Sequence, residues 1–269
     1  MKRGLFCKPQ RYLSFRSDGA VQIKTVIVPD APGFLRGRAF AFLTDVHLRP
    51  SFSQAAFLRV LDALDALCPD ILLLGGDYGE GAVQQRRFFE AIQEREYPLG
   101  IFGAIGNNDR EALSCGELRE LAAHGGVRLL INESVCLRIG SGNLKIAGID
   151  EYKYGNPDAR GLFGDAVHSE FLRSQGGEFR VLLSHHPKIP EYAGTPAADL
   201  QFSGHTHGGQ FNFFGITPYT LGYNHGLWDL VSGDRVFGYT RLLVSNGIGM
   251  SVLPLRIGAR PQILHVKFA

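Results

Sequence analysis

Residues 39–47 read AFAFLTDVH, and residues 71–77 read ILLLGGD. Both begin with an apolar run that is too short for a helix and end in polar side chains, a pattern typical of a buried strand that leads into a loop. Residues 100–107, GIFGAIGN, repeat the pattern. Apolar residues recur at helical spacing over 57–67 and 83–96, between these runs. The first half therefore predicts alternating strands and helices, the α/β arrangement in which ligands gather at the carboxyl edge of a sheet.

The second half of the chain is dominated by predicted strands. They cover residues 135–139, 144–149, 179–184 and 200–203, and the first two flank a Gly-Ser-Gly-Asn turn typical of a hairpin. The tail from residue 211 predicts short strands and turns. Together with a strand predicted over 21–28, these segments favour two mixed sheets packed face to face, with helices outside. We assign residues 1–20 to a basic N-terminal segment and residues 21–269 to a single domain.

The composition is that of an ordinary globular protein, because 45% of the 269 residues are hydrophobic and the net charge is +2. This charge argues against a nucleic acid polymer as the main partner. We expect no membrane span and no signal peptide. Residues 1–16 carry basic but no acidic side chains, which fits either weak contact with an anionic bilayer or a solvated terminus. The four scattered cysteines favour a reduced, cytoplasmic protein, with at most peripheral contact at the inner membrane face.

Polar side chains with the chemistry of metal ligands follow the predicted strands. They are Asp45, His47, Asp77, Asn107, His185, His205 and His207. Carboxylate, amide and imidazole ligands together suit Mn, Fe or Zn better than Mg or Ca. Taken singly, each aspartate fits a helix N-cap or turn, and each histidine fits a core or surface position. Their joint occurrence at the ends of strands favours a metal centre.

These motifs resemble the signature of the calcineurin-like metallophosphoesterases, and the resemblance runs from about residue 22 to the C-terminus. It implies a four-layer α-β-β-α sandwich and a dinuclear centre of divalent metals. By motif, the first metal would be bound by Asp45, His47 and His207, and the second by Asn107, His185 and His205, with Asp77 bridging both. His185 is preferred to His186 because the ligand of the family follows the apolar strand directly. Two adjacent metals activate water and stabilise the oxygens of a phosphoryl group during transfer.

The residue after Asn107 departs from the family pattern. The family usually has a histidine there, which is regarded as protonating the leaving oxygen, whereas this chain has Asn108. An amide can donate a hydrogen bond but cannot deliver a proton at neutral pH. We therefore assign Asn108 to the catalytic site and expect a good leaving group, as in a pyrophosphate. Reduced activity is the alternative explanation.

The segment GHTHGGQ, residues 204–210, and the tail over 242–263 resemble a bacterial branch with membrane-associated phosphoesterases and UDP-2,3-diacylglucosamine pyrophosphatases. Aromatic residues after the metal histidines could form an apolar wall of the pocket or ordinary sheet core; they are Phe211, Phe213, Phe214, Ile216 and Tyr219. Arg256 is assigned either to a substrate phosphate or to a structural role. His225 is predicted to line the pocket, and residues 152–154 to edge it.

The sequence thus predicts a dinuclear-metal phosphohydrolase, with a nucleotide-diphosphate-linked lipid or a similar pyrophosphate as the leading substrate class. The alternatives are a phosphodiesterase acting on cyclic or small nucleotide diesters and a non-catalytic scaffold on the same fold. We expect a small-molecule or lipid-linked phosphate as the partner and infer no obligate protein partner.

Overall fold

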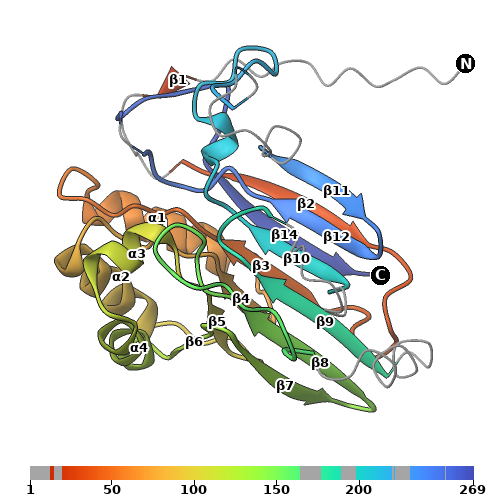
Figure 1. Cartoon of the computed structure of the whole chain (residues 1–269). Coiled ribbons are helices and arrows are strands. Elements are labelled where there is room, and N and C mark those ends of the chain that lie inside the picture. The colour runs from red at the N-terminus through yellow and green to blue at the C-terminus, as the bar shows by residue number, and fades with distance from the viewer. Residues whose placement is uncertain are drawn as a thin grey trace, which may run out of the picture.

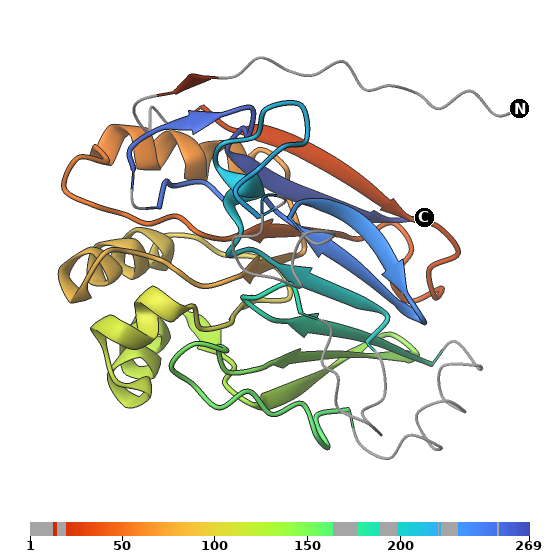
Figure 2. The same cartoon turned by 45° about the horizontal axis from the view of Figure 1, so that its top comes forward.

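A computed structural model describes residues 13–14, 20–163, 177–188, 198–219, 221, 231–251 and 253–269 of the chain. Two six-stranded sheets pack against each other, and four helices cover one of them (Figures 1 and 2). No helix within these ranges combines the length and the apolar content needed to cross a bilayer.

The first sheet is mixed and has the strand order β2-β14-β3-β4-β5-β6. Its strands are β2 (Gln22–Val28), β3 (Ala39–Leu43), β4 (Ile71–Leu74), β5 (Ile101–Gly103), β6 (Val127–Leu129) and β14 (Gln262–Phe268). From β3 to β6 the strands are parallel, so their carboxyl ends meet at one edge of the sheet. The C-terminal strand β14 enters between β2 and β3, parallel to the first and antiparallel to the second.

The helices that connect these parallel strands cover the outer face of the first sheet (Figure 1). They are α1 (Gln54–Asp65), α2 (Ala82–Gln93), α3 (Asn107–Ala112) and α4 (Cys115–His124). The side chain of Ser53 caps α1 by accepting a hydrogen bond from the Ala56 amide at 3.1 Å. Helix α1 buries Phe57, Val60 and Leu61, the face predicted from its apolar spacing.

The second sheet is also mixed and has the order β11-β12-β10-β9-β8-β7. Its strands are β7 (Glu133–Ile139), β8 (Gly142–Gly148), β9 (Glu178–Leu183), β10 (Leu200–Ser203), β11 (Gly233–Phe237) and β12 (Thr240–Val244). The predicted hairpin is the antiparallel pair β7 and β8. A separate short pair joins β1 (Leu13–Ser14) to β13 (Arg256–Ile257).

The core between the two sheets is apolar and tightly packed. Phe42 of the first sheet and Phe202 of the second are fully buried, with ring centroids 5.1 Å apart. The prediction of two mixed sheets with helices is confirmed. On the outer face of the second sheet, the loop after β8 packs Ala159, Leu162 and Phe163. Residues 164–176 and 189–197, which connect strands of the second sheet, lie outside the described residues.

Candidate metal centre

The centre lies where the carboxyl ends of strands from both sheets face each other. Asp45, Asp77 and Asn107 follow β3, β4 and β5 of the first sheet. His185 and the segment 205–207 follow β9 and β10 of the second sheet. The backbone amide of His205 donates to both oxygens of Asp45 at 3.0 Å, which joins the two sheets at this edge. The expected gathering of polar residues at strand ends is therefore present in space.

The first group of potential ligands contains Asp45, His47 and His207. One ligand atom from each lies within 4.8 Å of the others, and all three residues are buried. Nε2 of His207 is 3.6 Å from Oδ1 of Asp45, and the rings of His47 and His207 have centroids 4.9 Å apart. These are the residues that the sequence assigns to the first metal, and the structure brings them together.

The second group contains Asp45, Asp77 and His185, again with ligand atoms within 4.8 Å of one another. Nδ1 of His205 lies 3.3 Å from Nε2 of His185, so this histidine also faces the group. Oδ2 of Asp77 is 3.4 Å from Nε2 of both His47 and His185, one histidine from each predicted metal site. Asp77 therefore lies between the two sites, where a bridging ligand must be.

The donor atoms fit divalent metals in number, type and burial. Nε2 of His47 and Oδ1 of Asn107 are buried atoms with no hydrogen-bond partner among the described residues, and such atoms normally have a partner. Nδ1 of His185 lies 2.8 Å from the Gly75 carbonyl. The proton on this nitrogen donates to the carbonyl, which leaves Nε2 free as a ligand.

The electrostatics of the centre also call for bound cations. Burial raises the pKa of Asp45, and the nearby Asp77 carboxylate raises it further. Burial by itself would lower the pKa of His185, but the carboxylates of Asp77 and Asp45 raise it to about 10. When no metal is bound, the two buried carboxylates therefore favour the protonated form of His185, because burying negative charge without compensation is costly.

The backbone around the ligands is unusual. Asp45, His47, Asp77, His205 and His207 all have positive φ, between 44° and 66°. Non-glycine residues adopt this left-handed region only at an energetic cost, and such strain concentrates at functional sites.

Neighbouring glycines provide the space that the two carboxylates occupy. A Cβ atom on Gly106 would lie 2.1 Å from Oδ1 of Asp77, and one on Gly204 would lie 2.0 Å from Oδ2 of Asp45. Any side chain at these two positions would displace a ligand.

Asp109, which is not among the predicted site residues, links the loop that contains Asp77 to the loop that contains Gly106 and Asn107. It is fully buried, and Oδ2 accepts hydrogen bonds from the amides of Asp77 at 2.7 Å and Gly106 at 2.9 Å. Oδ1 accepts from the amide of Tyr78 at 2.9 Å. The sequence signal for this role is an acidic residue two positions after the predicted ligand Asn107.

A second supporting unit lies behind His47. Its Nδ1 is 3.1 Å from Oε1 of Glu80, and the same oxygen accepts a hydrogen bond from Arg49 at 2.7 Å. Arg49 also donates to the Met250 carbonyl. A carboxylate behind a metal-binding histidine fixes its tautomer and orientation. Neither Arg49 nor Glu80 belongs to a motif that we singled out in the sequence.

Arg256 does not take the place that we considered for it beside the substrate. Its guanidinium is fully buried and donates to the carbonyls of Gly249 and His207. Nη2 also lies 3.0 Å from Nδ1 of His207. The assignment to a substrate phosphate is therefore wrong, because this arginine packs behind a ligand loop, which is the structural alternative. His225 lies outside the described residues.

Asn108 lies beside the bridging position. Its backbone amide donates to Oδ1 of Asp77 at 2.9 Å, and its side-chain Nδ2 donates to Oδ2 at 3.1 Å. Nδ2 is also 3.1 Å from Nδ1 of His47. The side chain lines the cleft, so it is near any group that reacts there.

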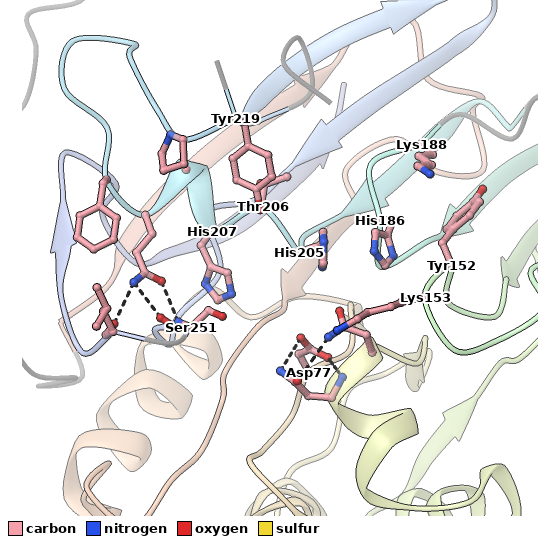
Figure 3. Close-up of a pocket in the computed structure, with 17 residues that line it drawn as sticks. Asp77, Tyr152, Lys153, His186, Lys188, His205, Thr206, His207, Tyr219 and Ser251 are labelled. Carbon is pink, nitrogen blue, oxygen red and sulfur yellow. Dashed lines mark hydrogen bonds between the residues drawn. The ribbon is translucent and has the colours of Figure 1, made fainter. Parts of the chain in front are cut away.

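A cleft of about 750 Å³ opens over the ligands (Figure 3). Phe211 and Tyr219 line the cleft. For these two residues, the expectation that the aromatic stretch lines the pocket is confirmed. Phe213, Phe214 and Ile216 are instead 52%, 79% and 56% exposed, so they belong neither to the wall nor to a core. The cleft has the size of a site for a small organic molecule. Its remaining lining includes Tyr152, Lys153, His186, Lys188, Pro218 and Leu253.

Comparisons with known proteins agree with this geometry. Residues 39–209 match the calcineurin-like phosphoesterase family. The chain is 28% identical over 250 residues to the metallophosphoesterase YkuE of Bacillus subtilis, which covers 90% of this chain and 81% of that protein. It is 29% identical over 223 residues to the protein YpbG of the same organism, over 82% and 77% of the two chains. A metallophosphoesterase of Campylobacter jejuni, Cj0846, is 26% identical over 90% of this chain but only 62% of its own length. The chain belongs to the calcineurin-like phosphoesterase family and is a metal-dependent phosphoesterase.

Proposed function

We propose that the protein hydrolyses a phosphate ester or anhydride with two divalent metals, and that its leading substrate class is a nucleotide-diphosphate-linked lipid or a similar pyrophosphate. The observation that carries the proposal is the position of Asp77 between two ligand groups at the floor of the cleft. Asp45, His47 and His207 would hold one metal. Asn107, His185 and His205 would hold the other. When bound, such a pair activates water and stabilises the oxygens of the transferred phosphoryl group.

The surroundings of Asn108 support a substrate with a good leaving group. Its amide nitrogens are engaged with the Asp77 carboxylate, and an amide has no proton to give at neutral pH. A phosphate leaving group is a weak base and departs without protonation, whereas a simple alkoxide does not. The proposal of an anhydride bond rests on this difference.

The apolar residues of the cleft lining support an apolar part in the substrate. They are Phe211, Pro218, Tyr219 and Leu253, and Leu253 is 53% exposed although it is apolar. Apolar side chains at a pocket mouth favour ligands that carry an acyl chain or a flat ring. A small nucleotide diester would also offer a ring to these apolar residues. A phosphodiesterase that acts on cyclic or small nucleotide diesters is therefore the second candidate.

The test is a substrate panel assayed with Mn, Fe and Zn. It compares nucleotide-diphosphate lipids, cyclic nucleotides, aryl phosphate diesters and monoesters. We expect the highest kcat/KM for the diphosphate lipid and no turnover after chelation. Higher kcat/KM for cyclic nucleotides would replace the leading substrate with the second candidate. Failure to turn over any member with any metal would refute the proposal and favour a scaffold.

A further inference from the structure

We propose that Lys153 and Lys188 form a binding site for a second anionic group of the substrate, namely the non-reacting phosphate of a diphosphate. Both lysines line the cleft. In Figure 3 they lie with Tyr152 and His186 on the side of the cleft opposite Ser251. The inference deepens the proposed function and rests on it, since it assumes that a phosphoryl group reacts at the metal ligands.

The two lysines are carried by backbone segments that other residues hold in place. Lys153 lies in a turn after β8. Its backbone amide donates a hydrogen bond to the buried carboxylate of Glu151 at 2.6 Å. Lys188 lies just beyond His185, and its carbonyl accepts a hydrogen bond from Gln201 at 3.0 Å. A binding group on a fixed backbone loses less conformational freedom when its ligand arrives.

Their ammonium groups are available to a ligand. Among the described residues, neither ammonium has a carboxylate within 4.0 Å. Instead Nζ of Lys188 lies 5.0 Å from the centroid of the Tyr152 ring, and Nζ of Lys153 lies 4.6 Å from that of Tyr154. Cation–π contact orients an ammonium without using its hydrogen-bond donors. The side chain of Tyr154 also accepts a hydrogen bond from Lys153, and the other donors of this ammonium can bind a phosphate.

A continuous row of rings links these lysines to the metal ligands. The ring of Tyr152 is 5.5 Å from that of His186, which in turn is 3.8 Å from that of His205. His186 is buried, and its Nδ1 has no hydrogen-bond partner among the described residues.

The charge distribution of the cleft therefore orients a substrate. The ligand carboxylates at the floor require metals and so select the reacting phosphoryl group. Lys153 and Lys188 offer two positive charges, and Phe211, Pro218 and Tyr219 offer apolar surface elsewhere in the lining. A diphosphate diester matches this pattern, because its second phosphate carries a charge that a simple phosphodiester lacks at that position.

The experiment uses the metal-loaded full chain and two substrates. One is thymidine 5′-(p-nitrophenyl phosphate), which has a single phosphate, and the other is a uridine diphosphate diester. The diphosphate is also measured as a competitive inhibitor of the first substrate, so that its affinity is obtained whether or not it is cleaved. The variants are Lys153→Ala, Lys188→Ala and their double mutant. Lys267→Ala is the matched control, because Lys267 is exposed on β14 and is not part of the cleft lining.

Each single variant should weaken binding of the diphosphate about tenfold, the size of one charge-assisted hydrogen bond of ~1.4 kcal/mol. Lys→Arg variants should restore most of it, and raised salt should reduce the difference from wild type. The monophosphate substrate should change less than about twofold. Equal loss for both substrates, unchanged diphosphate affinity, or the same loss in Lys267→Ala would overturn the inference. If the aryl diester itself is not cleaved, the proposed function fails instead, and calorimetric binding of a methylene-bridged diphosphate diester still tests the lysines.

Discussion

Replacing Glu80 should weaken one metal site and leave the other intact. Glu80 touches no substrate, but its Oε1 lies 3.1 Å from Nδ1 of His47. A proton on Nδ1 of His47 leaves its Nε2 unprotonated. Nε2 is buried and has no hydrogen-bond partner among the described residues, so in this tautomer it can bind metal. Arg49 holds the carboxylate in place from the other side at 2.7 Å. Glu80→Gln keeps an acceptor for both partners and removes only the negative charge, whereas Glu80→Ala removes the contact.

The expected magnitude follows from the exposure of this carboxylate. Removing such a partner of a metal-binding histidine typically costs about 10- to 100-fold in metal affinity. The side chain of Glu80 is 42% exposed, so water screens its charge, and the loss in Glu80→Gln should be near the lower limit. We expect about tenfold, or ~1.4 kcal/mol, for Glu80→Gln, and a loss closer to the upper limit for Glu80→Ala.

The assay is a titration of metal-free protein with Mn or Zn in competition with a chelator. Because His47 belongs to the group with Asp45 and His207, only one of two metal equivalents should bind more weakly. Activity at saturating metal should stay close to that of wild type. Glu117→Gln is the control, since Glu117 caps α4 through Ser114 and is fully exposed. Unchanged affinity in both Glu80 variants would show that this contact does not orient His47.

Four other predictions concern the ligands and Asn108. Asp77→Ala should abolish turnover and reduce bound metal measured by elemental analysis, since the shared carboxylate is lost; full activity in this variant or with chelator present would contradict the mechanism. Asn108→His should flatten the dependence of rate on leaving-group pKa in a series of aryl phosphate diesters, and should help poor leaving groups by up to ~10²–10⁴-fold if a general acid is regained. Parallel slopes for the two proteins would remove the basis for an anhydride substrate. The raised pKa of His185, about 10, means that the metal-free site carries a proton at pH 7 to 8, and metal must displace it. Calorimetry in buffers of different ionisation enthalpy should therefore detect proton release, and affinity should rise with pH below this pKa; binding without proton release would show that His185 is neutral. Finally, His205 has φ of 66°, so His205→Gly should be more stable than His205→Ala by about 1 kcal/mol in chemical denaturation without metal. If His205→Ala were the more stable variant, as expected at a position with negative φ, residue 205 would not keep the left-handed conformation.

The strands and most ligands could be predicted because they depend on local sequence. The predicted strands over 71–74 and 200–203 match β4 and β10 in the structure. Apolar runs of this length have few alternatives to a buried strand, and a polar residue at the end of such a strand must lie at the edge of the sheet. Helices α3 and α4 are not among the predicted elements, because they are short and their apolar content is low. The local signal for α4 is the capping box of Ser114 and Glu117.

The remaining features depend on contacts between distant parts of the chain. Nothing in the local sequence places β14 between β2 and β3. Arg256 is buried only because the carbonyl of His207 and that of Gly249 converge on it, which no spacing reveals. The same holds for Glu80, whose role depends on the orientation of a histidine from another loop. These residues support the ligands but do not belong to their motifs.

The left-handed backbone explains how ligands from two sheets reach one point. A side chain that follows a strand in extended conformation would continue the alternation of the sheet and point toward one face. Positive φ at Asp45, Asp77 and His205 instead turns each chain sharply just beyond the strand, so that the side chains converge between the sheets. This conformation costs on the order of 1 kcal/mol or more at each residue. Asp109 offsets part of that cost at Asp77, because it accepts hydrogen bonds from the amides of Asp77 and Tyr78. Metal bound by Asp45, Asp77 and His205 would stabilise these loops further, which would link their folding to the function of the centre.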